Sequence, residues 1–180
     1  MGTHIALLRG INLGGHNRVA MSDLRQLCVD AGFADVRTYV QSGNVVFTST
    51  RDDPGAISHD LSARLRTDLG VAAAVVVRTV EEFAAVVAGN PFQQPAAADP
   101  TTVHAAFLSA EPNDPSSLTF NPDTYVPERL VAGDRVRYLL LPNGIGRSKL
   151  APALLRRAGD IAVTVRNWRT VTELLRIARG

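Results

Sequence analysis

The alternation of apolar and polar positions divides the chain into two runs of similar elements. Four stretches of the first run have the β-branched, aromatic or continuous apolar character of strands: residues 4–8, 36–40, 45–48 and 71–77. Between them, apolar residues recur at helical spacing over residues 22–31 and 54–69. The predicted order is βαββαβ, the ferredoxin-like unit, followed by an extra helix over residues 80–87.

The second run repeats this order. Its strand-like stretches are residues 103–108, 129–131, 135–141 and 161–165, and its helical stretches are residues 114–118 and 149–158. Proline, glutamine and alanine dominate residues 91–101, which we interpret as a linker between the halves. The expected fold is α+β, with two tandem ferredoxin-like (βαββαβ) subdomains over residues 1–90 and 102–180, each with an extra helix after it.

Polar residues predict where several helices begin. Ser22 is expected to cap the helix over residues 22–31, and Asp53 the helix over residues 54–69. Ser148 is expected to cap the helix over residues 149–158. A Thr-Val-x-Glu capping box begins at Thr79 and again at Thr170, in each case directly after a predicted strand or its turn.

Composition narrows the classes of protein that fit. The 180 residues are 46% hydrophobic and 20% charged, enough for one substantial core or two small ones. The sequence contains no signal segment and no run of eighteen apolar residues, so we expect a cytoplasmic protein without a membrane span. The single cysteine, Cys28, excludes an internal disulfide and is expected to be buried on a helix. A net charge of +2 permits nucleic acid as a partner without arguing for it.

The glycine loop, residues 9–18, lies between the first strand and the first helix. Its three glycines let the backbone adopt positive φ and turn N–H groups toward one point, and its arginines and asparagines suit a phosphate or carboxylate. The first and second strands should run in the same direction, so this loop is expected to face residues 41–44. The ligand-binding residues predicted at this first edge are Arg9, Gly10, Asn12, Gly14, Gly15, Asn17, Arg18, Gln41, Ser42 and Asn44.

The same reasoning brings residues 142–149 and 166–169 together at a second polar edge. A Gly-x-Gly turn that leads into a helix beside basic residues outlines an anion site, although its spacing fits neither a Walker loop nor a dinucleotide fingerprint. The ligand-binding residues predicted here are Gly146, Arg147, Ser148, Lys149, Arg166 and Asn167. Trp168 is interpreted as a core residue rather than a stacking platform. Whether the two edges form one cleft stays open.

Four segments resemble the bacterial family catalogued as domain of unknown function 1697. They are residues 8–15, 38–47, 141–150 and 166–171, so the resemblance extends over nearly the whole chain. It implies an α+β fold with two similar subdomains and brings no established activity or catalytic residues. Where the family pattern leads us to expect Gly-Lys-Asn, the chain has Gly15, His16 and Asn17. If a fixed charge at that position binds an anion, His16 makes the binding weaker and pH-dependent near neutrality.

The sequence names no reaction, and three hypotheses follow from it. The four histidines are dispersed and no metalloprotease or nucleophile-elbow motif occurs, so we expect no metal site and no cofactor. The favoured hypothesis is a binding module for a phosphate-bearing ligand, either a nucleotide or a nucleic acid. The second is a metal-free hydrolase similar to acylphosphatases, in which Arg9 or Arg18 binds the phosphoryl group and Asn44 or Gln41 positions water. The third treats the polar edges only as a subdomain or subunit interface, which should leave no open pocket between the glycine loop and the hairpin. The identity of the ligand and the oligomeric state stay open.

Overall fold

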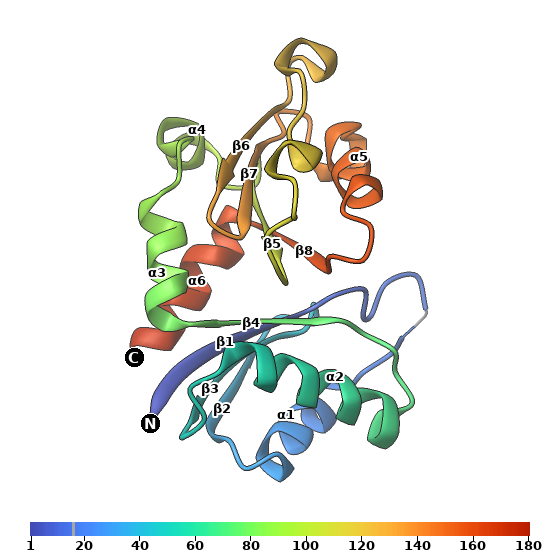
Figure 1. The fold of residues 1–180 in the computed structure, drawn as a ribbon. Helices are drawn as coiled ribbons and strands as arrows, with labels where there is room; N and C mark the ends of the chain where they lie inside the picture. The colour runs from blue at the N-terminus through green and yellow to red at the C-terminus, as the bar shows by residue number, and fades with distance from the viewer. Residues whose placement is uncertain (16) are drawn as a thin grey trace. The chain divides into compact units, whose positions relative to one another are not determined.

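The fold is mixed α+β, as the sequence predicts. A computed structural model of the protein describes residues 1–15 and 17–180 (Figure 1). The chain separates into two compact units: the first comprises Met1–Ala84 and Leu174–Gly180, and the second comprises Ala85–Glu173. Each unit contains one four-stranded antiparallel sheet with helices.

The first sheet has the strand order β2-β3-β1-β4. Its strands are β1 (Gly2–Leu8), β2 (Ala34–Tyr39), β3 (Asn44–Ser49) and β4 (Val75–Thr79). In the centre, Ile5 of β1 is paired with Val46 on one side and Arg78 on the other. Because β1 and β2 are both antiparallel to β3, their C-terminal ends lie at the same edge of the sheet. The glycine loop therefore begins beside the β2–β3 turn.

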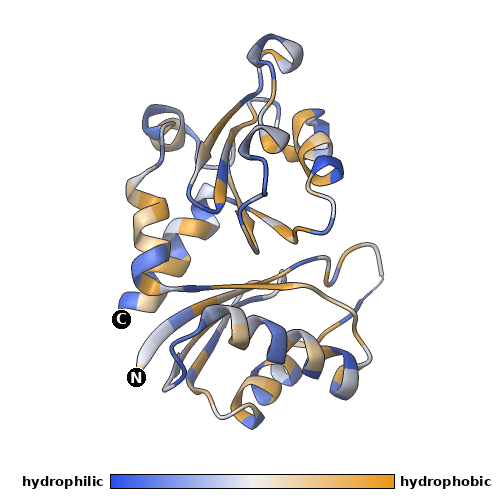
Figure 2. Cartoon of the chain, in the orientation of Figure 1, coloured by the Kyte–Doolittle hydropathy of each residue, from blue (hydrophilic) through white to orange (hydrophobic). Residues whose placement is uncertain are grey.

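Helices α1 (Met21–Asp30) and α2 (Pro54–Leu69) cover one face of this sheet. The strand residues that meet them alternate along the chain, as Val45 and Phe47 do, because successive side chains of a strand point to opposite faces. Figure 2 shows the hydrophobic character of these strands. Asp53 caps α2 as predicted, since its side chain accepts hydrogen bonds from the backbone of Gly55 and Ala56.

The second sheet has the strand order β6-β7-β5-β8. Its strands are β5 (Val103–Leu108), β6 (Arg129–Gly133), β7 (Val136–Leu140) and β8 (Val163–Asn167). Helix α5 (Leu150–Arg157) packs Leu150 and Leu154 into the same core cluster as Leu108 and Leu139. The unit also contains α4 (Gln93–Ala98) and three short 3₁₀ helices, η1 (Pro115–Leu118), η2 (Pro122–Tyr125) and η3 (Ile145–Arg147).

Helices α3 (Val80–Ala88) and α6 (Trp168–Arg179) follow the last strands of the two sheets. The capping box predicted at the start of α3 is confirmed: Thr79 N donates to Glu82 Oε2 at 3.0 Å, and Glu82 N donates to Thr79 Oγ1 at 3.1 Å. The prediction of a second capping box, beginning at Thr170, is wrong. Helix α6 begins two residues before Thr170, and Asn167 Oδ1 accepts the backbone N–H of Thr170.

Several predicted boundaries also differ from the structure. Ser22 does not cap α1, because the helix begins at Met21 and Ala20 occupies the N-cap position in an extended conformation. Strand β4 begins at Val75, four residues later than predicted. Residues 93–98, within the stretch interpreted as a linker, form α4. The helix expected after Asp114 is a single 3₁₀ turn.

Two residues with distinctive chemistry lie in the core, as predicted. Cys28 is 1% exposed and Trp168 is 7% exposed. Burial raises the pKa of the Cys28 thiol to about 12, so this side chain is not a thiolate at neutral pH.

None of the helices that the structure describes combines the length and the apolar character that a bilayer crossing requires.

Candidate functional site

Asn12 joins the glycine loop to the β2–β3 turn. Its side-chain nitrogen Nδ2 donates to the carbonyl oxygens of Val19 and Gln41, each at 3.0 Å. Its Oδ1 accepts the backbone N–H of Val19 at 2.9 Å. Both amide hydrogens are therefore used within the protein. Asn12 was predicted to bind ligand, and in the structure it holds the two turns together.

The glycine loop adopts the backbone conformations that its composition predicts. Gly10, Gly14 and Gly15 have φ values of 71°, 57° and 86°. Asn17 also has positive φ, and its Nδ2 donates to the carbonyl oxygen of Gly10 at 3.1 Å. The Asn12 N–H in turn donates to the Asn17 carbonyl at 3.0 Å. These bonds close the loop on itself. His16 lies outside the described residues.

The β2–β3 turn is held by its own amide and by β1. Asn44 is fully buried, and its Nδ2 donates to Tyr39 O at 3.0 Å and to Ser42 Oγ at 2.8 Å. The carbonyl oxygen of Gly43 accepts the backbone N–H of Leu8 at 2.8 Å. Donating a hydrogen bond from Asn44 Nδ2 to an attacking water would require breaking these bonds within the turn, which weakens one element of the hydrolase hypothesis.

A pocket of about 460 Å³ lies between the glycine loop and the turn. Its lining residues are Asn12, Gly15, Arg18, Val19, Ala20 and Gln41. The side chains of Arg18 and Gln41 are exposed and have no hydrogen-bond or ion-pair partner among the described residues. Arg9 is exposed as well, but it does not line this pocket.

The N-terminus of α1 opens at the same pocket. Ala20 is the N-cap of this ten-residue helix, and no described side chain caps it. Unpaired N–H groups and the helix dipole make such a terminus attractive to anions. Asp23, in the same first turn, opposes part of this attraction.

The second edge forms as predicted, but a protein carboxylate already occupies its anion-binding amides. The carboxylate of Glu128 accepts hydrogen bonds from Ser148 Oγ at 2.8 Å, Lys149 N at 3.1 Å and Leu150 N at 2.9 Å. Glu128 is 9% exposed. Ser148 Oγ also accepts the N–H of Ala151 in the first turn of α5, the bond expected of a cap, although Lys149 occupies the N-cap position. No local pattern identifies Glu128, because it lies twenty positions before Ser148.

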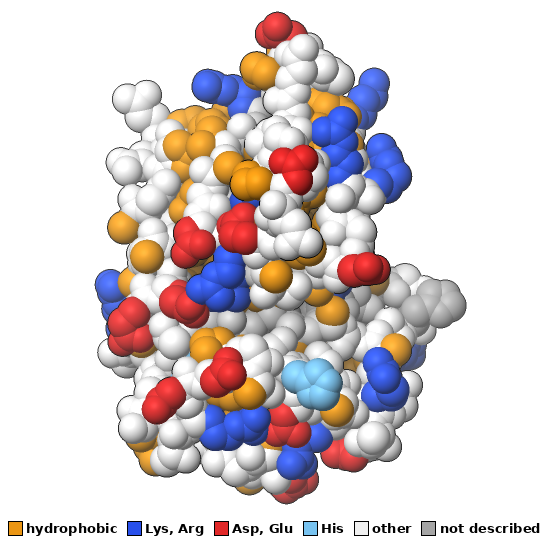
Figure 3. Space-filling view, viewed as in Figure 1, with side chains coloured by type: hydrophobic (Ala, Val, Ile, Leu, Met, Phe, Trp, Pro, Cys, Tyr) orange, Lys and Arg blue, Asp and Glu red, His pale blue; other side chains and the backbone are white. Residues whose placement is uncertain are grey.

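The other residues predicted at the second edge divide into a half-buried group and an exposed group. Arg166 donates to Val165 O at 2.9 Å, and burial lowers the pKa of its guanidinium to about 10. Asn167 caps α6. Gly146, Arg147 and Lys149 are exposed. In Figure 3, lysine and arginine side chains gather over α5.

The two loops of this edge both bond to the segment that precedes β5. Leu141 N donates to Thr102 O at 2.7 Å, and Trp168 N donates to Pro100 O at 3.1 Å. The predicted residues therefore share an edge, with residues 100–102 bonded to both loops.

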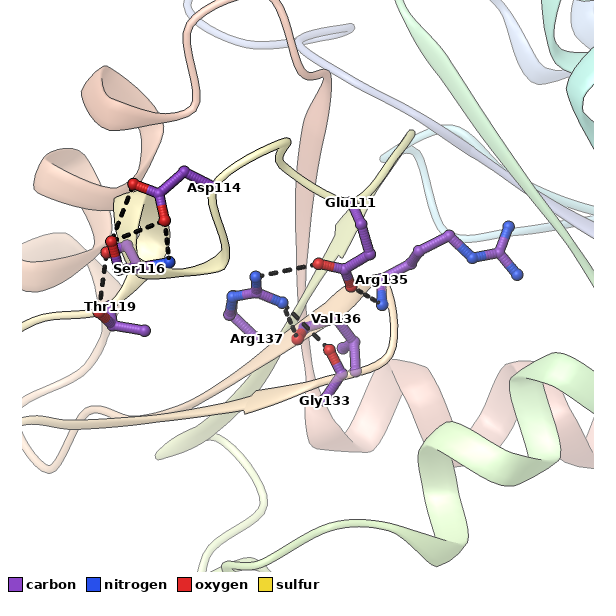
Figure 4. Close-up of polar contacts among 8 residues, drawn as sticks. All are labelled: Glu111, Asp114, Ser116, Thr119, Gly133, Arg135, Val136 and Arg137. Carbon is purple, nitrogen blue, oxygen red and sulfur yellow. Dashed lines mark hydrogen bonds and ion pairs between the residues drawn. The ribbon is translucent and has the colours of Figure 1, made fainter.

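A buried arginine that the sequence did not single out lies at the β6–β7 hairpin (Figure 4). Arg137 is 2% exposed, and its Nη2 lies 3.3 Å from Glu111 Oε2. Its Nη1 donates to the carbonyl oxygens of Gly133 and Val136 at 3.1 and 2.9 Å. Glu111 also accepts the backbone N–H of Arg135. A buried guanidinium needs such a counter-charge, so this cluster has a sufficient structural explanation.

No metal centre is evident within residues 1–15 and 17–180. In that part of the chain, no group of three or more His, Cys, Asp or Glu side chains is placed to hold a metal ion. At the first pocket, Arg18, Gln41 and the N-terminus of α1 are lining groups without a side-chain partner among the described residues.

Comparison with known proteins identifies the family. No functionally curated protein matches the sequence significantly. Among solved structures, the chain is similar to the conserved bacterial protein SP0830 from Streptococcus pneumoniae, with 22% sequence identity and a TM-score of 0.74 over 98% of each chain. At this identity the likeness shows the fold alone. A family profile described as "Protein of unknown function (DUF1697)" matches residues 1–138, and the chain therefore belongs to the DUF1697 family.

Proposed function

We propose that the protein is a binding module for a phosphate-bearing ligand, held in the pocket between the glycine loop and the β2–β3 turn. The observation that carries this proposal is the pocket itself. Its volume of about 460 Å³ lies within the usual range for small-molecule sites. An edge that served only as an interface would be expected to pack these two turns together without such a space.

The groups around the pocket suit an anion. Arg18 offers a permanently charged, planar set of N–H donors that matches phosphate oxygens. Gln41 offers a side-chain amide that the protein does not otherwise use among the described residues. The uncapped N-terminus of α1 adds backbone donors at Ala20. The function of Asn12 in this proposal is to fix the distance between Arg18 and Gln41.

The structure favours binding over hydrolysis. The amide of Asn44 is engaged in the turn, and Gln41 is then the remaining amide that could orient water. No described side chain at this pocket is placed as an acid, base or nucleophile.

The strand orders of the two sheets bear on a finer classification of the fold. Two sheets with the strand orders β2-β3-β1-β4 and β6-β7-β5-β8 support a classification as two tandem ferredoxin-like subdomains. We propose that these correspond to residues 1–90 and 102–180, in a cytoplasmic protein.

The test is a thermal-shift and titration screen against inorganic phosphate, nucleotides, acyl phosphates and short single-stranded oligonucleotides. It compares wild type with Arg18→Gln and with Arg66→Gln, a control that removes an exposed arginine from the last turn of α2. A ligand that binds only the native state raises the melting temperature by mass action. Wild type and Arg66→Gln are expected to bind a phosphate compound with equal affinity, and Arg18→Gln to bind it about 10- to 100-fold more weakly, as expected for losing a charged hydrogen bond.

Two results would contradict the proposal. One is the absence of any shift with every phosphate compound. The other is a ligand whose affinity is the same for wild type and Arg18→Gln, because that ligand would bind elsewhere.

A further inference from the structure

Two exposed apolar side chains lie beside the bond that joins the two turns. Leu13 is 67% exposed and directly follows Asn12, whereas Val40 is 51% exposed and directly precedes Gln41. Asn12 and Gln41 are hydrogen-bonded to each other at 3.0 Å, and both line the pocket. Two exposed aliphatic residues therefore adjoin, in the chain, two residues that line the pocket, although neither is itself a lining residue; we call Leu13 and Val40 the apolar rim.

Val40 also has an unusual backbone conformation. This residue has a φ of 49°, a left-handed conformation that β-branched residues rarely adopt and that stores strain. The bonds from Asn12 to Gln41 and from Asn44 to Tyr39 hold the chain on both sides of it. An asparagine would fit this backbone with less strain. Val40 thus exposes an apolar side chain from a backbone conformation that favours asparagine.

The pocket also has more space than a phosphate group alone needs. Its volume of about 460 Å³ can accommodate a ligand that combines a charged group with a larger body. Arg18 supplies the cationic part within the pocket, and Leu13 and Val40, next in the chain to the lining residues Asn12 and Gln41, offer exposed apolar surface. A nucleobase offers a flat surface that packs well between apolar side chains, and its phosphate offers the anion.

We propose that the ligand is a nucleoside phosphate whose base packs against Leu13 and Val40, an inference that rests on the proposed function of the same pocket. The phosphate pairs with Arg18, and the two aliphatic side chains add affinity for the base. Free phosphate and sugar phosphates bind the site more weakly, because they leave this apolar rim in water.

The experiment measures dissociation constants by calorimetric titration. The ligands are inorganic phosphate, ribose 5-phosphate and the nucleoside monophosphates AMP, GMP, CMP and UMP. The proteins are wild type, Leu13→Ser, Val40→Asn, Arg18→Gln and the control Val126→Asn, which replaces a valine that is 71% exposed in the second unit.

For wild type and Val126→Asn, at least one nucleotide is expected to bind about tenfold more tightly than ribose 5-phosphate, the ratio expected from burying part of one aliphatic side chain. Leu13→Ser and Val40→Asn should reduce this ratio to near one without changing the affinity for ribose 5-phosphate. Val40→Asn should melt at the same temperature as wild type or higher, since asparagine tolerates positive φ. Loss of the ratio in that variant is therefore not a folding defect.

Several results would overturn the inference. If wild type binds ribose 5-phosphate as tightly as every nucleotide, the apolar rim contributes nothing and only the proposed phosphate site survives. If no phosphate compound binds wild type, both proposals fail. If Leu13→Ser or Val40→Asn changes the oligomeric state in sedimentation experiments, the rim is a subunit interface instead.

Discussion

At the scale of single residues, Gly43 decides how closely the β2–β3 turn approaches β1. Its φ is 74°, and a Cβ added to it would lie 2.7 Å from Leu8 Cβ and 2.8 Å from Ile11 Cδ1. Real Cβ atoms do not approach other carbon atoms this closely. Only glycine allows both the conformation and the contact.

We predict that Gly43→Ala destabilises the protein by roughly 2–4 kcal/mol, from left-handed strain and overpacking together. Gly32→Ala is the matched control, because Gly32 has a φ of 85° with no atom within 4 Å of its added Cβ. Gly32→Ala should lower the free energy of unfolding by the left-handed strain alone, about 1–2 kcal/mol. Urea unfolding of both variants measures the difference. Equal costs would show that the turn can move away from Leu8 and Ile11 without penalty.

At the scale of elements, Glu128 attaches the start of β6 to the N-terminus of α5. Its carboxylate accepts three hydrogen bonds there, two of them from backbone N–H groups. The helix dipole adds to this attraction. What resembles an anion site in the sequence is thus a contact between two elements far apart in the chain.

We predict that Glu128→Gln destabilises the protein by about 2 kcal/mol. The charge-assisted hydrogen bonds are lost, and the glutamine NH₂ group, itself a donor, would face N–H or O–H donors that need an acceptor. Glu81→Gln, at an exposed acid in the first turn of α3, should cost less than about 1 kcal/mol. Hydrogen exchange provides the local measurement. The amides of Lys149 and Leu150 should exchange faster in Glu128→Gln, and unchanged protection there would contradict the assignment.

At the scale of the whole molecule, His104 makes stability depend on pH. It is 4% exposed in β5, and burial lowers its pKa from 6.5 to about 4, partly opposed by a hydrogen bond with the backbone of Thr102. The unfolded chain therefore takes up this proton at higher pH than the native state does. The free energy of unfolding therefore falls as the pH decreases from 6.5 to about 4, and His104 causes no further change below that pH.

We predict that between about pH 8 and pH 5 wild type loses about 2 kcal/mol more unfolding free energy than His104→Leu does. Both proteins share the titration of their carboxylates and other histidines, so the difference isolates His104. Chemical unfolding at several pH values measures it. Parallel stability curves for the two proteins would mean that His104 is readily protonated in the native state.

The sequence by itself determined the α+β class, the order of the eight strands and the meeting of two turns at one edge. Hydrophobic periodicity marks strands and helices because each must bury one face, and a crossover helix makes the strands on either side of it run in the same direction. The positive φ of Gly10, Gly14 and Gly15 was predictable for a local reason, since glycine lacks the Cβ that disfavours it.

The tertiary structure decided which polar groups stay available to a ligand. Asn12 and Asn44 look like ligand-binding amides in the sequence, yet hydrogen bonds within the first edge engage both. Glu128 fills the second edge from a distant part of the chain. Such pairings depend on which donors and acceptors come within hydrogen-bonding distance after packing. Local sequence preferences contribute too little free energy to select them, because buried polar groups bond to whatever partner the fold supplies.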